Sequence, residues 1–117
     1  MSDVIIWHNP RCSKSRQTLA LLEENGITPT VRLYLDDAPD LDDLKAAQAA
    51  LGLRAVEFCR VNEAAFAEAG LSKTDDDATL LAAMAATPKL IERPIVFAGG
   101  KAALGRPPEQ VLDLFKV

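Results

Sequence analysis

The chain has few of the residues that build metal centres and disulfide frameworks. Its 117 residues include two cysteines and one histidine, which form no cluster at the spacing that holds zinc. Two cysteines are also too few for the disulfide framework of a small secreted domain. The glycines do not form the fingerprint of a dinucleotide-binding turn. We therefore expect no metal and no bound cofactor.

An excess of positive charge and long apolar runs are also absent. Thirteen lysines and arginines against 17 aspartates and glutamates give a net charge of -4, so the chain has no general attraction for nucleic acids or anionic membranes. The apolar stretches are much shorter than a membrane span, and the residues that follow Met1 do not have the pattern of a secretion signal. We expect a cytoplasmic protein with neither nucleic acid nor membrane as a partner.

The N-terminal third has the pattern of a strand, a helix and a second strand. The apolar run Val4–Trp7 ends in turn-forming residues and predicts a buried strand. A helix is expected to begin near residues 12 and 13 and to end at Asn25-Gly26. A second strand is expected over Val31–Leu35. The connection between the two strands predicts that they are parallel.

The middle of the chain is predicted to be helical. Asp40 has the position of an N-cap, and apolar residues recur at helical spacing up to Gly52. Shorter helical segments are expected over residues 54–60, 63–69 and 77–86. Together they predict a helical insertion over about residues 40–90.

The C-terminal part predicts a hairpin followed by a helix. Two short apolar segments, Ile95–Ala98 and Lys101–Leu104, flank Gly99-Gly100, which suits a tight turn between antiparallel strands. Pro107-Pro108 then opens a final helix. The order βαβ, helical insertion, ββα is that of a thioredoxin-like α/β fold, so we predict a single domain over residues 1–117 with a mixed four-stranded sheet.

The first cysteine lies where a strand ends and a helix begins. Backbone N–H groups and the helix dipole are expected to face the sulfur of Cys12. Arg11 directly precedes Cys12, and Lys14 and Arg16 follow it in the first turns of the expected helix. His8 lies four residues before it. This basic setting predicts a lowered pKa and a reactive thiolate, whereas the alternative is an inert, buried thiol.

The neighbourhood of Cys12 predicts monothiol chemistry. Ser15 stands where a Cys-x-x-Cys dithiol has its second cysteine, so an external thiol must resolve a covalent adduct on Cys12. The Ser15 hydroxyl either bonds the thiolate or belongs to an ordinary first helical turn. His8 either orients the site or pairs with backbone at the turn. Cys59 is expected to be structural, with a role as resolving thiol as the alternative.

Three segments together resemble a known family. They are His8–Arg16 (HNPRCSKSR), Glu92–Val96 (ERPIV) and Gly105–Pro107 (GRP), and they are similar to those of the glutaredoxin-coupled arsenate reductases, of thioredoxin-like fold. The resemblance implies an oxidoreductase in which Cys12 attacks arsenate. It also implies glutathione as the reducing co-substrate and glutaredoxin as the partner that regenerates the cysteine.

The same resemblance implies that Arg60, Arg93 and Arg106 bind the oxyanion, and that Pro94 follows a cis peptide bond. Planar guanidinium donors suit a tetrahedral oxyanion beside a thiolate. Arg93 and Arg106 each stand next to a proline near a strand end, so one end of the sheet is expected to hold both. From the residues alone, Arg60 in a helical segment is more typical of an exposed surface charge.

Two departures from typical arsenate reductases keep other functions open. Ser13-Lys14 stands where glycine and threonine are typical, and residues 61–63 replace a basic stretch after Arg60. The alternatives are a monothiol oxidoreductase that acts on another oxyanion or on mixed disulfides, and a transcription adaptor that resembles the redox-responsive Spx regulators. The Spx regulators use a Cys-x-x-Cys switch, which Ser15 removes here.

Overall fold

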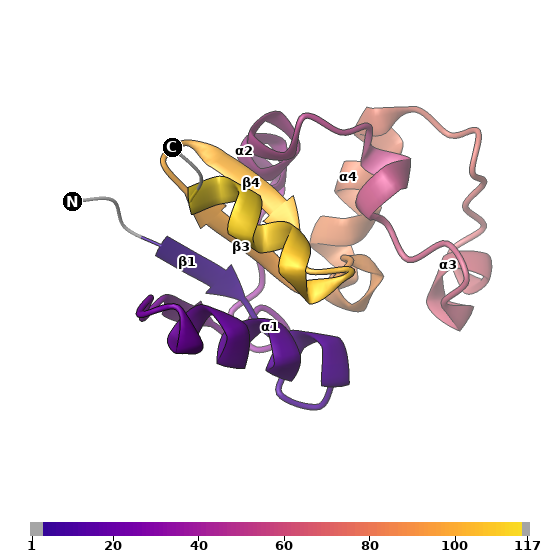
Figure 1. The fold of residues 1–117 in the computed structure, drawn as a ribbon. Coiled ribbons are helices and arrows are strands. Elements are labelled where there is room, and N and C mark those ends of the chain that lie inside the picture. Colours follow the sequence, from indigo (N-terminus) through magenta and orange to yellow (C-terminus); the bar gives the residue numbers. More distant parts are fainter. Residues whose placement is uncertain (1–3, 116–117) are drawn as a thin grey trace. The chain divides into compact units, whose positions relative to one another are not determined.

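A computed structural model describes residues 4–115 and contains a mixed four-stranded sheet (Figure 1). The strands are β1 (Val4–Trp7), β2 (Thr30–Arg32), β3 (Ile95–Ala98) and β4 (Lys101–Leu104), in the order β2-β1-β3-β4. β1 is parallel to β2 and antiparallel to β3, and β3 is antiparallel to β4. The predicted thioredoxin-like α/β fold with a mixed sheet is confirmed.

The described residues divide into two compact units. Residues 4–37 and 93–115 form the first unit, which contains the whole sheet, and residues 38–92 form the second. Among the predicted site residues, only Arg60 belongs to the second unit.

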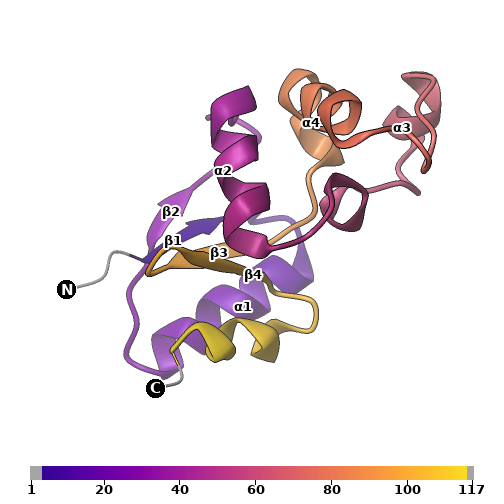
Figure 2. The same cartoon turned by 90° about the horizontal axis from the view of Figure 1, so that it is seen from above.

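Helix α1 (Ser13–Glu24) and the 3₁₀ helix η3 (Pro108–Phe115) lie on the same face of the sheet and contact each other (Figure 2). A core of fully buried apolar side chains joins the sheet to these helices: Ile6, Leu22, Val96 and Val111. Burial of apolar surface of this kind is the main force that holds such layers together. The predicted C-terminal helix is therefore present, with 3₁₀ rather than α geometry.

The second strand is shorter than predicted. β2 ends at Arg32, whose register partner is Trp7 at the end of β1, and the chain then turns. The carbonyl of Leu33 accepts hydrogen bonds from the N–H groups of Asp36 and Asp37, at 2.9 and 2.8 Å. The strand prediction over Val31–Leu35 was wrong at its C-terminal end, because an apolar run does not show where the neighbouring strand stops.

The predicted hairpin is confirmed. Gly99 and Gly100 have φ values of 59° and 78°, which place both in the left-handed region that glycine adopts without steric cost. The turn pairs Ala98 with Lys101, and the register runs to Ile95 opposite Leu104.

The second unit is helical, as predicted. It contains α2 (Leu41–Leu51), α3 (Ala64–Glu68) and α4 (Asp77–Ala86), with the 3₁₀ helices η1 (Ala55–Phe58) and η2 (Pro88–Leu90). None of the helices within residues 4–115 has the length and apolar character needed to span a bilayer.

The N-terminus of α2 confirms the predicted cap. The side chain of Asp40 accepts a hydrogen bond from the N–H of Asp43 at 2.8 Å, and the Asp43 carboxylate accepts from the N–H of Asp40 at 3.1 Å. Such a reciprocal capping box satisfies two N–H groups that a helix start leaves unpaired.

Candidate active site

The turn between β1 and α1 holds Cys12 in place. The N–H of Cys12 donates to the carbonyl of Asn9 at 3.0 Å, and the N–H of Arg11 donates to the Asn9 side chain at 3.0 Å. Cys12 itself is the N-cap of α1. Its half-buried sulfur therefore lies at the end of the helix where backbone N–H groups have no intrahelical acceptor.

The surroundings of Cys12 favour the thiolate. Burial acts to raise the pKa of Cys12, but it is outweighed by the N–H of Ser15, the charge of Arg93, the N–H of Lys14 and a hydrogen bond from the Arg93 side chain, so the pKa is lowered. The predicted direction is confirmed. The cation responsible is Arg93, however, rather than the arginines next to Cys12 in the sequence.

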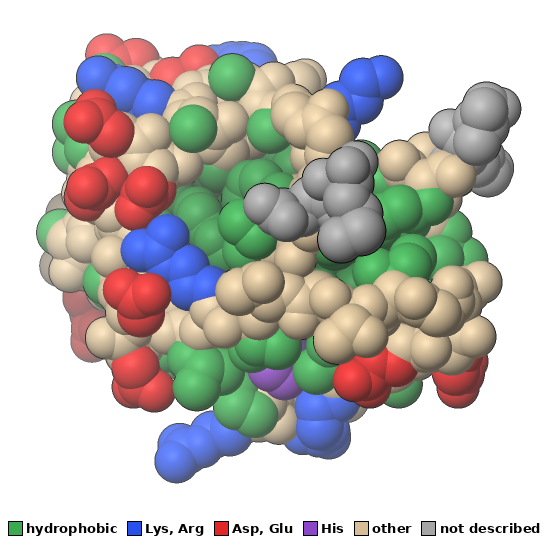
Figure 3. Space-filling view, turned by 90° about the vertical axis from the view of Figure 1, so that its left-hand side faces the viewer, with side chains coloured by type: hydrophobic (Ala, Val, Ile, Leu, Met, Phe, Trp, Pro, Cys, Tyr) green, Lys and Arg blue, Asp and Glu red, His purple; other side chains and the backbone are tan. Residues whose placement is uncertain are grey.

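His8 and Ser15 form a buried pair beside this turn. Nδ1 of His8 lies 2.7 Å from Oγ of Ser15, which also accepts a hydrogen bond from the N–H of Asn9 at 3.0 Å. His8, the one histidine of the chain, is only 6% exposed, and Figure 3 shows only a small purple patch of histidine among hydrophobic side chains. Burial, and then the charge of Arg16, lower the pKa of His8, so the ring is neutral at neutral pH.

The contacts of Ser15 show which of its groups acts on the sulfur of Cys12. Its hydroxyl is committed to His8 and Asn9, and its backbone N–H is the group that stabilises the Cys12 thiolate. The side chain thus positions the turn, while the main chain acts on the sulfur. The sequence analysis had predicted that backbone N–H groups face the sulfur, but for Ser15 itself it had considered only the hydroxyl.

The segments that contain Arg93 and Arg106 meet in the first unit. Arg93-Pro94 is a cis peptide bond, as the family resemblance implied, and Arg106-Pro107 is a second one. The N–H of Gly105 donates to the carbonyl of Pro94 at 3.0 Å, and the Arg106 guanidinium lies 3.4 Å from the carbonyl of Arg93. The two arginine-proline segments are therefore neighbours, as predicted.

Thr18 and Gly105, to which the sequence analysis assigned no role, tie these segments to α1. Thr18 Oγ1 donates to the carbonyl of Lys14 at 2.8 Å and lies 3.5 Å from the carbonyl oxygen of Gly105. A Cβ at Gly105 would lie 2.6 Å from Cγ of Pro94 and even closer to Thr18 Oγ1. Glycine is thus required at position 105 because the neighbouring atoms approach so closely. The signal in the sequence was the presence of Gly105 in the Gly-Arg-Pro segment that carries the family resemblance.

Arg60 and Cys59 belong to the second unit. The Arg60 guanidinium lies 3.1 Å from the Glu63 carboxylate and 3.4 Å from the carbonyl of Lys89. Cys59 is buried and forms a β-bridge with Ile91. Burial and, to a lesser extent, Glu92 raise the pKa of Cys59 to about 11. Cys59 is therefore an uncharged thiol at neutral pH, in agreement with its structural interpretation.

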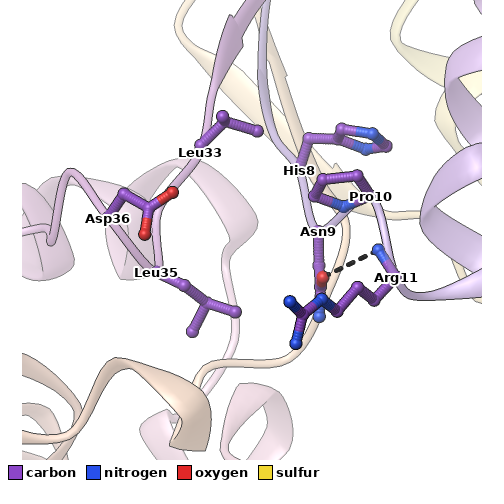
Figure 4. A pocket seen from close by; sticks show the side chains of 7 residues that line it. All are labelled: His8, Asn9, Pro10, Arg11, Leu33, Leu35 and Asp36. Carbon is purple, nitrogen blue, oxygen red and sulfur yellow. Dashed lines mark hydrogen bonds between the residues drawn. The ribbon is translucent and has the colours of Figure 1, made fainter.

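A cavity of about 340 Å³ lies beside the turn that precedes Cys12 (Figure 4). The segment from His8 to Arg11 forms one wall, and Leu33, Leu35 and Asp36 from the turn after β2 form the facing wall. Neither Cys12 nor the three candidate oxyanion-binding arginines line it. Within residues 4–115, no cluster of histidine, cysteine and acidic side chains suitable for a metal ion is present.

Comparison with known proteins identifies one family for almost the whole chain. The model of the ArsC family matches residues 7–114. The chain is 50% identical to a protein named arsenate reductase from Neisseria meningitidis serogroup B over 113 residues, or 95% of this chain and 97% of the relative. It is 49% identical to YfgD, an uncharacterized protein of Escherichia coli K12, with 95% of each chain covered.

Solved structures agree with this result. The solved structure of a protein named arsenate reductase from Vibrio cholerae matches this chain with a TM-score of 0.92 and 50% identity, and the match covers 96% of this chain and 97% of that one. A fold shared at this level of identity and coverage is that of a family member. The chain therefore belongs to the ArsC family.

Proposed function

We propose that this protein reduces arsenate to arsenite, with glutathione as the reductant and with a covalent intermediate on Cys12. The observation that supports this most strongly is the hydrogen bond between the Arg93 guanidinium and a Cys12 sulfur of lowered pKa. The nucleophile Cys12 is therefore in contact with Arg93, a cation suited to binding an oxyanion. Relatives at about 50% identity bear the name arsenate reductase.

In the first step the Cys12 thiolate attacks arsenic. A sulfur–arsenic bond forms, and one arsenate oxygen leaves as water after it takes up protons, so arsenic stays pentavalent. Arg93 and Arg106 offer planar donors to the remaining oxygens and offset the repulsion between thiolate and oxyanion. We assign the same role to Arg60.

In the second step glutathione supplies the electrons. Its sulfur attacks the sulfur of Cys12, and the sulfur–arsenic bond breaks with its electron pair left on arsenic, which becomes trivalent. The thiol proton ends on an oxygen of the departing arsenite. A glutaredoxin thiol then takes the glutathione group from the mixed disulfide and returns Cys12 to its reduced state.

The second candidate is a monothiol oxidoreductase for another oxyanion or for mixed disulfides. The ion pair between Arg60 and Glu63 favours this alternative, because it reduces the charge that Arg60 offers to arsenate. The two functions differ in their need for the arginines. Reduction of arsenate requires Arg93 and Arg106 for a low KM, whereas reduction of a small neutral disulfide does not.

The test is arsenate-dependent NADPH consumption with glutathione, glutaredoxin and glutathione reductase. We expect turnover by the wild type, none by Cys12→Ser, and most of the wild-type rate for Cys59→Ser. Turnover of hydroxyethyl disulfide without turnover of arsenate would contradict the first function and support the second.

A further inference from the structure

We infer that the cavity beside the Cys12 turn binds glutathione, with Arg11 on its glycine carboxylate and Asp36 on its ammonium group. This inference rests on the proposed function, which requires a thiol to reach Cys12 but does not say where that thiol binds. Figure 4 shows Arg11 and Asp36 on the two facing walls.

The size of the cavity suits a tripeptide. Its volume of about 340 Å³ lies at the lower end of the range typical of small-molecule sites, about 300–1,000 Å³. Pro10, Leu33 and Leu35 supply apolar walls, and the two leucines are 40% and 44% exposed. Exposed leucines of this kind gain from being covered by the methylene groups of a ligand.

The two charged side chains of the cavity suit the two ends of glutathione. Within residues 4–115, the Arg11 guanidinium and the Asp36 carboxylate form no hydrogen bond or ion pair, since the contacts of both residues are made by their backbone N–H groups. A cation and an anion that face one cavity without protein partners are complementary to a ligand with a carboxylate at one end and an ammonium at the other. Glutathione has these groups, and the second carboxylate, on the same carbon as the ammonium, must then point away from Asp36.

The order of the carboxylate, thiol and ammonium groups along glutathione matches the arrangement of Arg11, Cys12 and Asp36 in the protein. In glutathione the glycine carboxylate is one residue from the cysteine thiol, and Arg11 is one residue from Cys12, with their Cα atoms about 3.8 Å apart. Arg11 lines the cavity and directly precedes Cys12, so a ligand whose carboxylate is held by Arg11 lies beside the turn that carries Cys12. The γ-glutamyl ammonium then extends toward Asp36, on the turn after β2.

The cavity is distinct from the oxyanion site. Its lining includes none of Arg60, Arg93 and Arg106, whereas Arg93 bonds directly to the sulfur of Cys12. A thiol that displaces arsenic must approach Cys12 from a side that the oxyanion does not occupy. Separate sites for oxyanion and thiol meet this requirement.

The first test measures binding without turnover. Calorimetric titration with S-methylglutathione, which cannot react, is compared for wild type, Arg11→Gln and Asp36→Asn. Lys101→Gln and Glu24→Gln are matched controls, because they remove the same charges from exposed sites in the same unit. We expect each cavity variant to weaken binding about three- to tenfold, as is typical for loss of one charge-assisted contact. Equal affinities in all five proteins would overturn the inference.

A second test assigns the carboxylate. The glycine ethyl ester of S-methylglutathione should bind wild type more weakly than the free acid, by about the factor that Arg11→Gln costs, and should lose nothing further in Arg11→Gln. Independent, additive losses would place the glycine carboxylate elsewhere and contradict the assignment.

A third test separates this inference from the proposed function. The rate at which glutathione disulfide modifies Cys12 is divided by the rate for hydroxyethyl disulfide, with no arsenate present. We expect the ratio to fall about three- to tenfold in Arg11→Gln and Asp36→Asn. This result without arsenate turnover would reject the proposed function alone. Arsenate turnover with an unchanged KM for glutathione in both variants would reject the glutathione site alone.

A protein thiol as the true occupant would give a different pattern. In that case S-methylglutathione would not bind, and Arg11→Gln would slow only the removal of glutathione from Cys12 by glutaredoxin. That pattern would overturn the inference.

Discussion

The guanidinium of Arg93 is hydrogen-bonded to the sulfur of Cys12. The two residues are far apart in the sequence, and the sheet brings them together because β1, which leads to Cys12, is paired with β3, which follows Arg93-Pro94. This contact helps to stabilise the Cys12 thiolate, and under the proposed function it also marks where the oxyanion binds.

The pH dependence of alkylation tests this contact. We predict that iodoacetamide modifies Cys12 with a midpoint below the ordinary thiol pKa, and that Arg93→Gln moves the midpoint upward. Arg11→Gln is the control, because Arg11 does not contribute to the lowered pKa of Cys12. An identical midpoint for wild type and Arg93→Gln would contradict the account.

Cys59 makes stability depend on pH in the alkaline range. Its pKa is about 11 in the folded chain against an ordinary value of 9.0, so between these values the unfolded chain has released a proton that the folded chain keeps. Stability therefore falls as pH rises through this window. We predict that Cys12→Ser loses more stability from pH 9 to 11, measured by urea unfolding, than the double variant Cys12→Ser/Cys59→Ala. Parallel curves of stability against pH for the two variants would show that the pKa of Cys59 is not raised in the folded chain.

The hydroxyl of Ser15 is predicted to stabilise the turn. Ser15→Ala leaves His8 Nδ1 and the N–H of Asn9 without their partner, which should cost about 1–3 kcal/mol in the free energy of unfolding. Ser13→Ala, an exposed change on the same helix, is the control. Urea unfolding measures both, and equal midpoints would show that the pair contributes nothing.

Gly105 is predicted to be intolerant of a methyl group. Gly105→Ala forces the new Cβ against Thr18 Oγ1 and Pro94, and overpacking of this kind costs about 1–3 kcal/mol. Thr18→Ala removes one of the two clashing groups, so the double variant should lose less stability than the sum of the single changes. Thermal or urea unfolding tests this, and strict additivity would contradict the close approach.

Local signals in the sequence were sufficient for much of the fold. The N-cap at Asp40, the Gly99-Gly100 turn and the start of a helix at Cys12 depend on neighbouring residues, and each was predicted correctly. The end of β2 was not, because it depends on where β1 stops. The strand pattern over Leu33–Leu35 gave no indication that this segment enters a turn and that Leu33 and Leu35 line a cavity.

The candidate site was predictable only in part for the same reason. The low pKa of Cys12 was foreseen from a helix start and nearby basic residues, yet the effective cation is Arg93. Nothing local indicated the hydrogen bond between Ser15 and His8 or the tight fit at Gly105. These features arise when distant segments pack, and a single sequence does not state which segments meet.

The most direct test of the central claim is to locate the glutathione that the reaction leaves on the protein. Wild type is incubated with glutathione, with and without arsenate and in the absence of glutaredoxin, and intact and peptide masses are measured. The account predicts a glutathione mixed disulfide on Cys12 that forms only when arsenate is present. A mixed disulfide that is independent of arsenate, or that lies on Cys59, would contradict it.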